Sequence, residues 1–132
     1  MLSDPTIVHV TAGSPYEHDW LMLRLFCHTM EYAQTPGRFI KLLISDGNEN
    51  NPRYLGVVSI SSDVITITDR DKYIGWNLED KKTKLSMLMN MSTCVPLQPF
   101  GFNFNGGKLL ASLAFSKEVQ EYFQQKYNEP LL

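Results

Sequence analysis

The sequence has no long apolar run, few cysteines and no large excess of either charge. None of its apolar stretches approaches the roughly 18 residues of a membrane-spanning helix, and Met1 to Pro5 lack the features of a secretory signal. Two cysteines argue against a disulfide scaffold or a zinc site. A net charge of -2 argues against duplex nucleic-acid binding by this chain alone. We therefore expect a cytoplasmic protein with reduced cysteines, no metal site and no membrane contact.

The size and composition fit one globular domain, since 43% of the 132 residues are hydrophobic and 20% are charged. The patterns indicate an α/β (α+β) domain with a mixed, mostly antiparallel sheet flanked by helices, and not a doubly wound nucleotide fold. Strands are expected at 38–45 and 53–61, with a short strand or irregular edge at 64–68 and a proline-broken edge strand at 93–104. Helices are expected from Ser14 to about residue 34 and at 78–90, 108–115 and 116–127.

The predicted order of elements stops where another strand is expected, because Leu131 and Leu132, which could begin a strand, follow the turn at 128–130 that ends the last helix. We therefore expect a single domain, 1–132, that is incomplete at its C-terminus or that has an exposed sheet edge. An open edge strand can pair with another chain, so a homodimer through this edge is one expectation.

The first candidate site is a glycine turn, Asn105-Gly106-Gly107-Lys108, which precedes a predicted helix. Glycines allow a close approach of the backbone, and the free amides at a helix start attract phosphate. Lys108 adds a positive charge, so the turn is a candidate site for the pyrophosphate of coenzyme A. Neither the P-loop spacing nor the dinucleotide fingerprint is present. The alternative, favoured by spacing alone, is a plain turn before a helix.

The second candidate is the run Asp69-Arg70-Asp71-Lys72, followed by Tyr73 and Trp76. Arg70 is suited to pairing with a phosphate or carboxylate, and the two aromatic rings are expected to cover the polar site. Asp69 and Asp71 are the candidates for a general base. The alternative is an ion-paired loop that Trp76 anchors to the core.

Cys94 and three alternating phenylalanines are further candidate functional residues. Cys94 is a candidate nucleophile, although no basic residue stands beside it and buried cysteines are usually inert. Phe100, Phe102 and Phe104 alternate along a predicted extended segment, which places their rings on one side. Core packing is the favoured role for these rings, and stacking on nucleic-acid bases is the alternative.

Several of these segments resemble one protein family. They are Tyr54-Leu55-Gly56, Arg70 to Trp76, the leucine-bearing helix that ends at Asn90, Val95-Pro96 and Gly107 to Leu110. Over about residues 54–127 the chain is similar to a group of phage and bacterial proteins that includes the A component of the Druantia anti-phage system. This group in turn resembles, more distantly, the phage Mom DNA-modification proteins, which are placed in the GCN5-related N-acetyltransferase (GNAT) superfamily.

The resemblance implies a GNAT-like fold in which acetyl-CoA or another acyl-CoA lies beside a splayed strand. Residues 98–104 correspond to that strand and Asn105 to Lys108 to the pyrophosphate turn. The superfamily's Gln/Arg-x-x-Gly-x-Gly/Ala loop is not reproduced in this sequence. The closing strands of the fold are expected to lie beyond residue 132.

The resemblance leads to two main hypotheses about function. One is acyl transfer from acyl-CoA to an amine, in modification of a nucleic-acid base or in phage defence or counter-defence. Its residues would be Asp69 or Asp71 as the base, with Arg70, Tyr73 and Trp76 at the substrate. The other is a non-catalytic structural or binding subunit of a larger protein complex. An inhibitor of a host protein is a third, less favoured reading.

Overall fold

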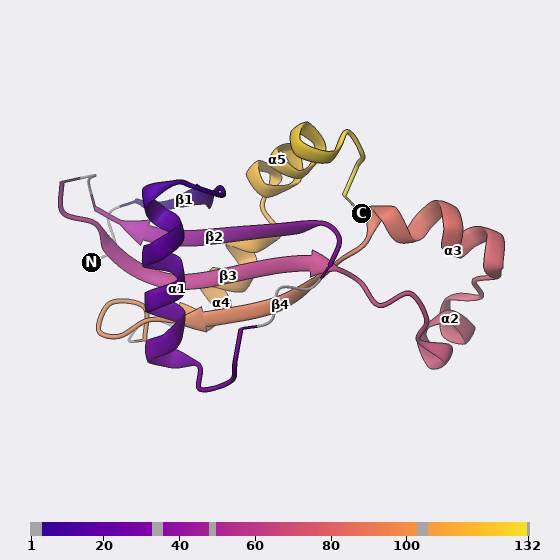
Figure 1. Cartoon of the computed structure of the whole chain (residues 1–132), viewed down its shortest axis with the longest axis horizontal. Coiled ribbons are helices and arrows are strands. Elements are labelled where there is room, and N and C mark those ends of the chain that lie inside the picture. Colours follow the sequence, from indigo (N-terminus) through magenta and orange to yellow (C-terminus); the bar gives the residue numbers. More distant parts are fainter. Residues whose placement is uncertain (1–3, 33–35, 48–49, 103–105, 132) are drawn as a thin grey trace.

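The computed structural model describes residues 4–32, 36–47, 50–102 and 106–131. They form a four-stranded antiparallel sheet with helices on both faces (Figure 1). The strands, in their order across the sheet, are β1 (Pro5–Val10), β2 (Phe39–Asp46), β3 (Arg53–Ser62) and β4 (Met89–Pro96). The helices are α1 (Pro15–Cys27), α2 (Thr68–Ile74), α3 (Leu78–Lys84), α4 (Gly106–Ala114) and α5 (Lys117–Tyr127), with a 3-10 turn η1 (Leu85–Met87). The α+β fold expected from the sequence is confirmed.

The predicted hairpin forms the centre of the sheet. Strands β2 and β3 pair antiparallel, with a register shift between Ile44 and Ser45. Both strands are buried along most of their length, because helices cover the two faces of the sheet. At the turn, the Asp46 carboxylate accepts hydrogen bonds from Arg53 at 2.8 Å and from the Asp4 amide at 3.1 Å. These bonds join the hairpin to the segment that leads into β1.

Helix α1 covers one face of the sheet. Its Trp20 is fully buried, and the indole N–H donates to the carbonyls of Leu42 at 3.1 Å and Val58 at 3.2 Å. This bifurcated bond attaches the helix to β2 and β3 at once. Leu43 and Val57 complete the apolar contact beneath the helix.

Helices α4 and α5 cover the opposite face (Figure 1). Leu110 and Ala114 of α4, and Val119 and Phe123 of α5, join the larger core beneath the sheet. The Tyr127 hydroxyl lies 2.9 Å from the carbonyl and 2.8 Å from the amide of Phe39, which fixes the end of α5 on β2. The apolar spacing in 117–127 had predicted this helix and its start at Ser116.

Several predicted boundaries are wrong. Helix α1 ends at Cys27, not near residue 34, and residues 64–68 contain no strand among those described. The helix predicted at 78–90 ends as η1 at Met87, and Met89 already begins β4. Strand β4 ends at Pro96, so residues 98–102 form turns and not the splayed strand expected at 98–104, whose last two residues lie outside the described ones. Strand β1 was not predicted.

The structure contains, among the described residues, no helix that is both long and apolar enough to cross a membrane.

Candidate functional site

The segment between β3 and β4, residues 63–88, extends beyond the end of the sheet (Figure 1). We call it the arm, and we call the sheet with α1, α4 and α5 the body. The arm contains α2, α3 and η1. Gly75 ends α2 in the left-handed conformation, with φ at 78°, and its amide donates to Asp71 O. Asn77 then caps α3, because its side chain accepts from the Glu79 and Asp80 amides.

The arm is held together by an ion-pair network centred on Asp71, which is only 5% exposed. Arg70 donates to Asp71 at 2.9 and 3.0 Å and to Asp63 at 2.5 Å. Lys81, from α3, forms a further ion pair with Asp71. The Lys81 contact, followed by that of Arg70, lowers the pKa of the Asp71 carboxyl against the opposing effect of desolvation. A carboxylate with a lowered pKa is a weak proton acceptor at neutral pH.

The other predicted residues of this segment lie apart. Asp69 is exposed on α2, and Tyr73 is 93% exposed, so the Tyr73 ring does not cover Arg70. Trp76 is partly buried, and its ring centroid lies 5.8 Å from the Arg70 guanidinium carbon. The charged residues pair with one another, but they lie on helix α2 and not in a loop, and Trp76 is not among the residues that pack on either core. The catalytic role of Asp69 or Asp71 and the substrate role of Arg70 stay predictions.

The glycine turn lies near Pro96, at the end of β4 opposite to the arm. Gly106 is buried at the start of α4, and a Cβ added there would lie 1.6 Å from the Gly101 carbonyl oxygen. Close packing therefore explains this glycine. A Cβ at Gly107 would have nothing within 4 Å, and Lys108 is exposed beside it. The predicted cofactor residue Asn105 lies outside the described residues.

The structure does not bring the two predicted halves of the site together. The arm enters the sheet at Met89, whereas Gly106 lies against Pro96, so the length of β4 separates them. At about 3.3 Å per residue, that separation is roughly 20 Å. One catalytic centre that contains both Asp71 and the glycine turn is therefore incompatible with this geometry.

Cys94 of β4 is near the glycine turn, with its sulfur 3.9 Å from the Gly107 carbonyl oxygen. Burial raises the pKa of its thiol. The thiol is thus not activated as a nucleophile by its surroundings.

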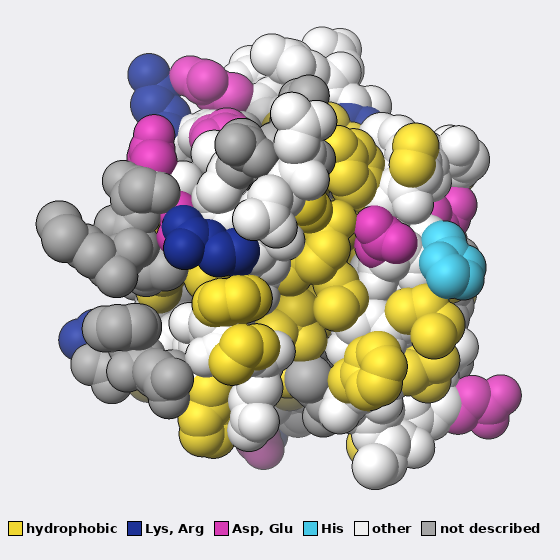
Figure 2. Space-filling view, turned by 90° about the vertical axis from the view of Figure 1, so that its left-hand side faces the viewer, with side chains coloured by type: hydrophobic (Ala, Val, Ile, Leu, Met, Phe, Trp, Pro, Cys, Tyr) yellow, Lys and Arg dark blue, Asp and Glu magenta, His cyan; other side chains and the backbone are white. Residues whose placement is uncertain are grey.

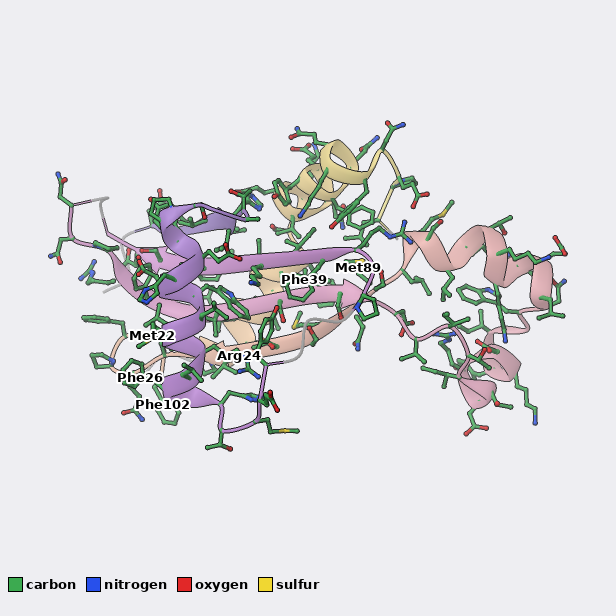
Figure 3. The ribbon with its side chains drawn as sticks, in the orientation of Figure 1. Met22, Arg24, Phe26, Phe39, Met89 and Phe102 are labelled. Atoms are coloured by element: carbon green, nitrogen blue, oxygen red, sulfur yellow. The ribbon has the colours of Figure 1, made fainter. Side chains whose placement is uncertain are left out.

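Beside these residues lies a groove of about 560 Å³ between α1 and the end of β4. It is lined by Leu23, Phe26, Val95, Pro96, Leu97, Gln98 and Phe102, none of which is charged. Phe26 and Phe102 are 81% and 63% exposed, and Figure 3 shows them on the same side of α1 as Met22. Figure 2 shows the hydrophobic side chains gathered over this end of the molecule. The predicted core packing is therefore wrong for Phe102 and for Phe100, which is 44% exposed, and Phe104 lies outside the described residues.

Two buried cations on the α1 face were not identified from the sequence. Arg24 donates to the Met30 carbonyl at 3.1 Å and lies over the Tyr32 ring at 4.9 Å, on the other side of α1 from Phe26 (Figure 3). Lys41 of β2 is 5.2 Å from the same ring and pairs with Glu17 at 3.5 Å. Both cations pack on aromatic faces, which lowers the cost of burying their charge.

Comparisons with known proteins give one family. The family model described as Druantia protein DruA matches residues 2–131 of this chain. Druantia protein DruA from Escherichia coli (strain UMEA 4076-1) is 26% identical over 125 residues, which cover 95% of this chain and 30% of that protein. The chain thus spans less than a third of that relative's length. No solved structure matches the chain.

Proposed function

The chain belongs to the Druantia DruA family, and from this premise we propose that it acts in anti-phage defence as a protein-binding component of a multi-component system. The observation that carries the proposal is the family match, which extends over residues 2–131. The match includes both the body and the arm. The chain spans 30% of its E. coli relative, so the proposal concerns the part of that protein that the two chains share.

The arm is the part of the chain that we assign to partner binding. Its apolar side chains Ile65, Tyr73 and Leu78 are exposed, because the arm has no apolar core of its own in which to bury them. Ile65 and Leu78 line one hollow, and exposed apolar groups gathered in this way are typical of protein contact surfaces. Lys82 and Lys84 on the same segment pair with acidic neighbours, which leaves no single sign of charge for nucleic acid to select.

The test is a phage-challenge assay in a host that carries a complete Druantia-type gene set including this chain. Deletion of the chain is expected to abolish protection. Leu78→Ser, at a position that is 74% exposed in the arm, is expected to reduce protection. The matched control is Phe115→Ser, at a position that is 73% exposed in the body, which should leave protection intact. Unchanged protection without the chain would refute the defence role, and equal losses from both substitutions would refute the role of the arm.

A second candidate function is acyl transfer from acetyl-CoA or another acyl-CoA to an amine, with a nucleic-acid base as the acceptor. The specific observation in its favour is the open space at Gly107, which leaves the first amides of α4 accessible beside the exposed Lys108. The separation of this turn from Asp69 and Asp71 means that the proton acceptor for such a reaction would have to be another group.

The acyl-CoA hypothesis has a direct binding test. Acetyl-CoA at 100 times its dissociation constant should stabilise the chain by about 2.7 kcal/mol, which raises the melting temperature by several degrees. Gly107→Leu should remove that shift without disturbing the fold, because the site has room for a side chain. The absence of a shift with the unaltered chain would refute acyl-CoA binding and leave the protein-binding role in place.

A further inference from the structure

Strand β4 is the edge of the sheet on one side, among the residues that the structure describes. Its eight residues carry no charged side chain. Edge strands usually have a lysine, a proline, a β-bulge or a cover that prevents pairing with another chain, and within its length β4 has only the irregularity at Ser92. In β4 the one proline, Pro96, is the last residue, so most of the edge keeps its backbone donors and acceptors for a further strand.

Helix α1 provides a cover for such a further strand. It crosses the sheet, and its C-terminal end passes beyond β4 (Figure 1). Leu23 and Phe26 at this end line the uncharged groove together with Val95 and Leu97. A strand added outside β4 would lie beneath these side chains and would bury Phe26. The occupant that fits both the open edge and the groove is therefore an extended, uncharged polypeptide segment.

We propose that the occupant is β4 of a second copy of this chain, paired antiparallel in a two-fold symmetric dimer. An interface of this kind uses the same strand twice, so its register must be self-complementary. Opposed residues in an antiparallel pair point to the same face of the sheet. The faces of the β4 side chains therefore determine which register is allowed.

The irregularity in β4 selects that register. Met91 and Cys94 both pack on the α4 side, whereas Val95 packs on the α1 side. The regular alternation of β4 side chains between the two faces of the sheet is interrupted at Ser92, where the pairing with β3 shifts. Pairing centred between Ser92 and Thr93 places Met91 opposite Cys94 of the second copy, with both on the same face.

The same register brings a side chain of the second copy to the groove. Leu88 directly precedes β4, is extended and partly exposed, and would stand opposite Leu97. By strand alternation from Met89, which packs on the α4 side, Leu88 points to the α1 side. Leu88 of each copy would thus enter the groove lined by Phe26 and Phe102 of the other, so the dimer completes two equivalent apolar contacts.

The first test is the mass of the unaltered chain by sedimentation equilibrium over micromolar concentrations. A monomer–dimer equilibrium is expected. Leu88→Asp should shift it to monomer at the same concentration, because a carboxylate would be buried against Phe26. Val64→Asp, at a position that is 57% exposed in the arm, is the matched control and should remain dimeric. A monomer at all concentrations overturns the proposal, as does a dimer that Leu88→Asp leaves unchanged.

The second test fixes the register by disulfide formation. Met91→Cys places a thiol opposite Cys94 of the second copy, within the range that a disulfide spans. Diamide should then convert the chain to a covalent dimer on a non-reducing gel. Met89→Cys faces Pro96 in this register and, like the unaltered chain, should give little covalent dimer. Crosslinking of Met89→Cys in preference to Met91→Cys would overturn the proposed pairing.

This dimer goes beyond the proposed defence role and fails separately from it. The equilibrium is measured on the isolated chain, whereas protection is measured in cells with the complete gene set. A monomer that protects cells would contradict the dimer alone, and a dimer that does not protect would contradict the defence role alone.

Discussion

The two tryptophans of the chain stand in two differently built regions. Trp20, in the body, is fully buried and hydrogen bonded to two strands. Trp76, in the arm, is partly buried and lies beside Arg70 of an ion-pair network. In the body most of the buried side chains are apolar, and they form two cores. In the arm the one buried side chain of α2 is a carboxylate, and α3 has none.

This difference has consequences for stability. Apolar side chains have no charge to be screened or titrated, whereas an ion-pair network weakens with added salt and with protonation of its carboxylates. A segment with few buried apolar contacts is also expected to open locally, before the whole chain unfolds. The comparison therefore predicts large effects of substitutions in the body and small effects on overall stability in the arm.

The largest effect is expected for Trp20→Ala in the body. The substitution removes a fully buried ring and leaves the Leu42 and Val58 carbonyls without their indole donor. We expect a loss of about 4 kcal/mol in the free energy of unfolding. Urea denaturation followed by circular dichroism measures it. A loss below about 1 kcal/mol would show that α1 contributes little to the body.

The next effect separates two adjacent glycines. Gly106→Ala forces the backbone of α4 away from Gly101, and we expect a loss of about 2–3 kcal/mol. Gly107→Ala has open space at the same helix start and should not destabilise the chain. The same urea experiment compares them, and equal losses would contradict the close packing described at Gly106.

A smaller effect concerns His9 in the body. Burial lowers the pKa of its imidazole below the ordinary 6.5, against the opposing effect of Glu118. As the pH falls, the imidazole is therefore protonated in the unfolded chain before it is protonated in the folded chain. The free energy of unfolding decreases as the pH drops from about 6.5 toward the lowered pKa. For one proton the slope cannot exceed about 1.4 kcal/mol per pH unit. His9→Gln should flatten this part of the stability profile, and an unchanged slope would exclude His9 as its source.

The smallest effect is expected for Leu78→Ser in the arm. Because Leu78 is exposed, its replacement should change the free energy of unfolding by less than about 0.5 kcal/mol. The reduced phage protection expected for this variant would then reflect lost binding and not lost folding. A large loss of stability would show that Leu78 packs against the rest of the chain in solution.

The sequence predicted best what depends on local pattern. The turn formers at 46–52 predicted the β2–β3 hairpin, and Ser116 with the apolar spacing after it predicted α5. Strand β1 was missed because Pro5 to Val10 is short, and its pairing partner lies more than 30 residues further along the chain. The end of the helix at Met87 was missed because Leu88 and Met89 continue an apolar pattern that fits helix and strand equally well.

The candidate site was predictable only in part. The charged residues of the arm were identified as a possible ion-paired loop, and the structure pairs Arg70 with Asp63 and Asp71. The contribution of Lys81 was not foreseen, because it depends on how α3 packs beside α2. The groove could not be predicted from the sequence either, since Phe26 and Phe102 line the same groove only because α1 crosses over β4 in the fold.

The most direct test of the central contrast uses both tryptophans in the intact chain, labelled with 5-fluorotryptophan and followed by fluorine NMR. Trp76→Phe assigns the two resonances. Because the pKa of Asp71 is lowered from 3.8 in the folded chain, its ion pairs stabilise the arm above about pH 3.8 and are lost as the pH falls through the lowered value. On acidification from pH 5 to pH 2, the Trp76 resonance should move to its solvent-exposed position before the Trp20 resonance changes. A single transition in which both resonances move together would contradict the separate stabilisation of arm and body.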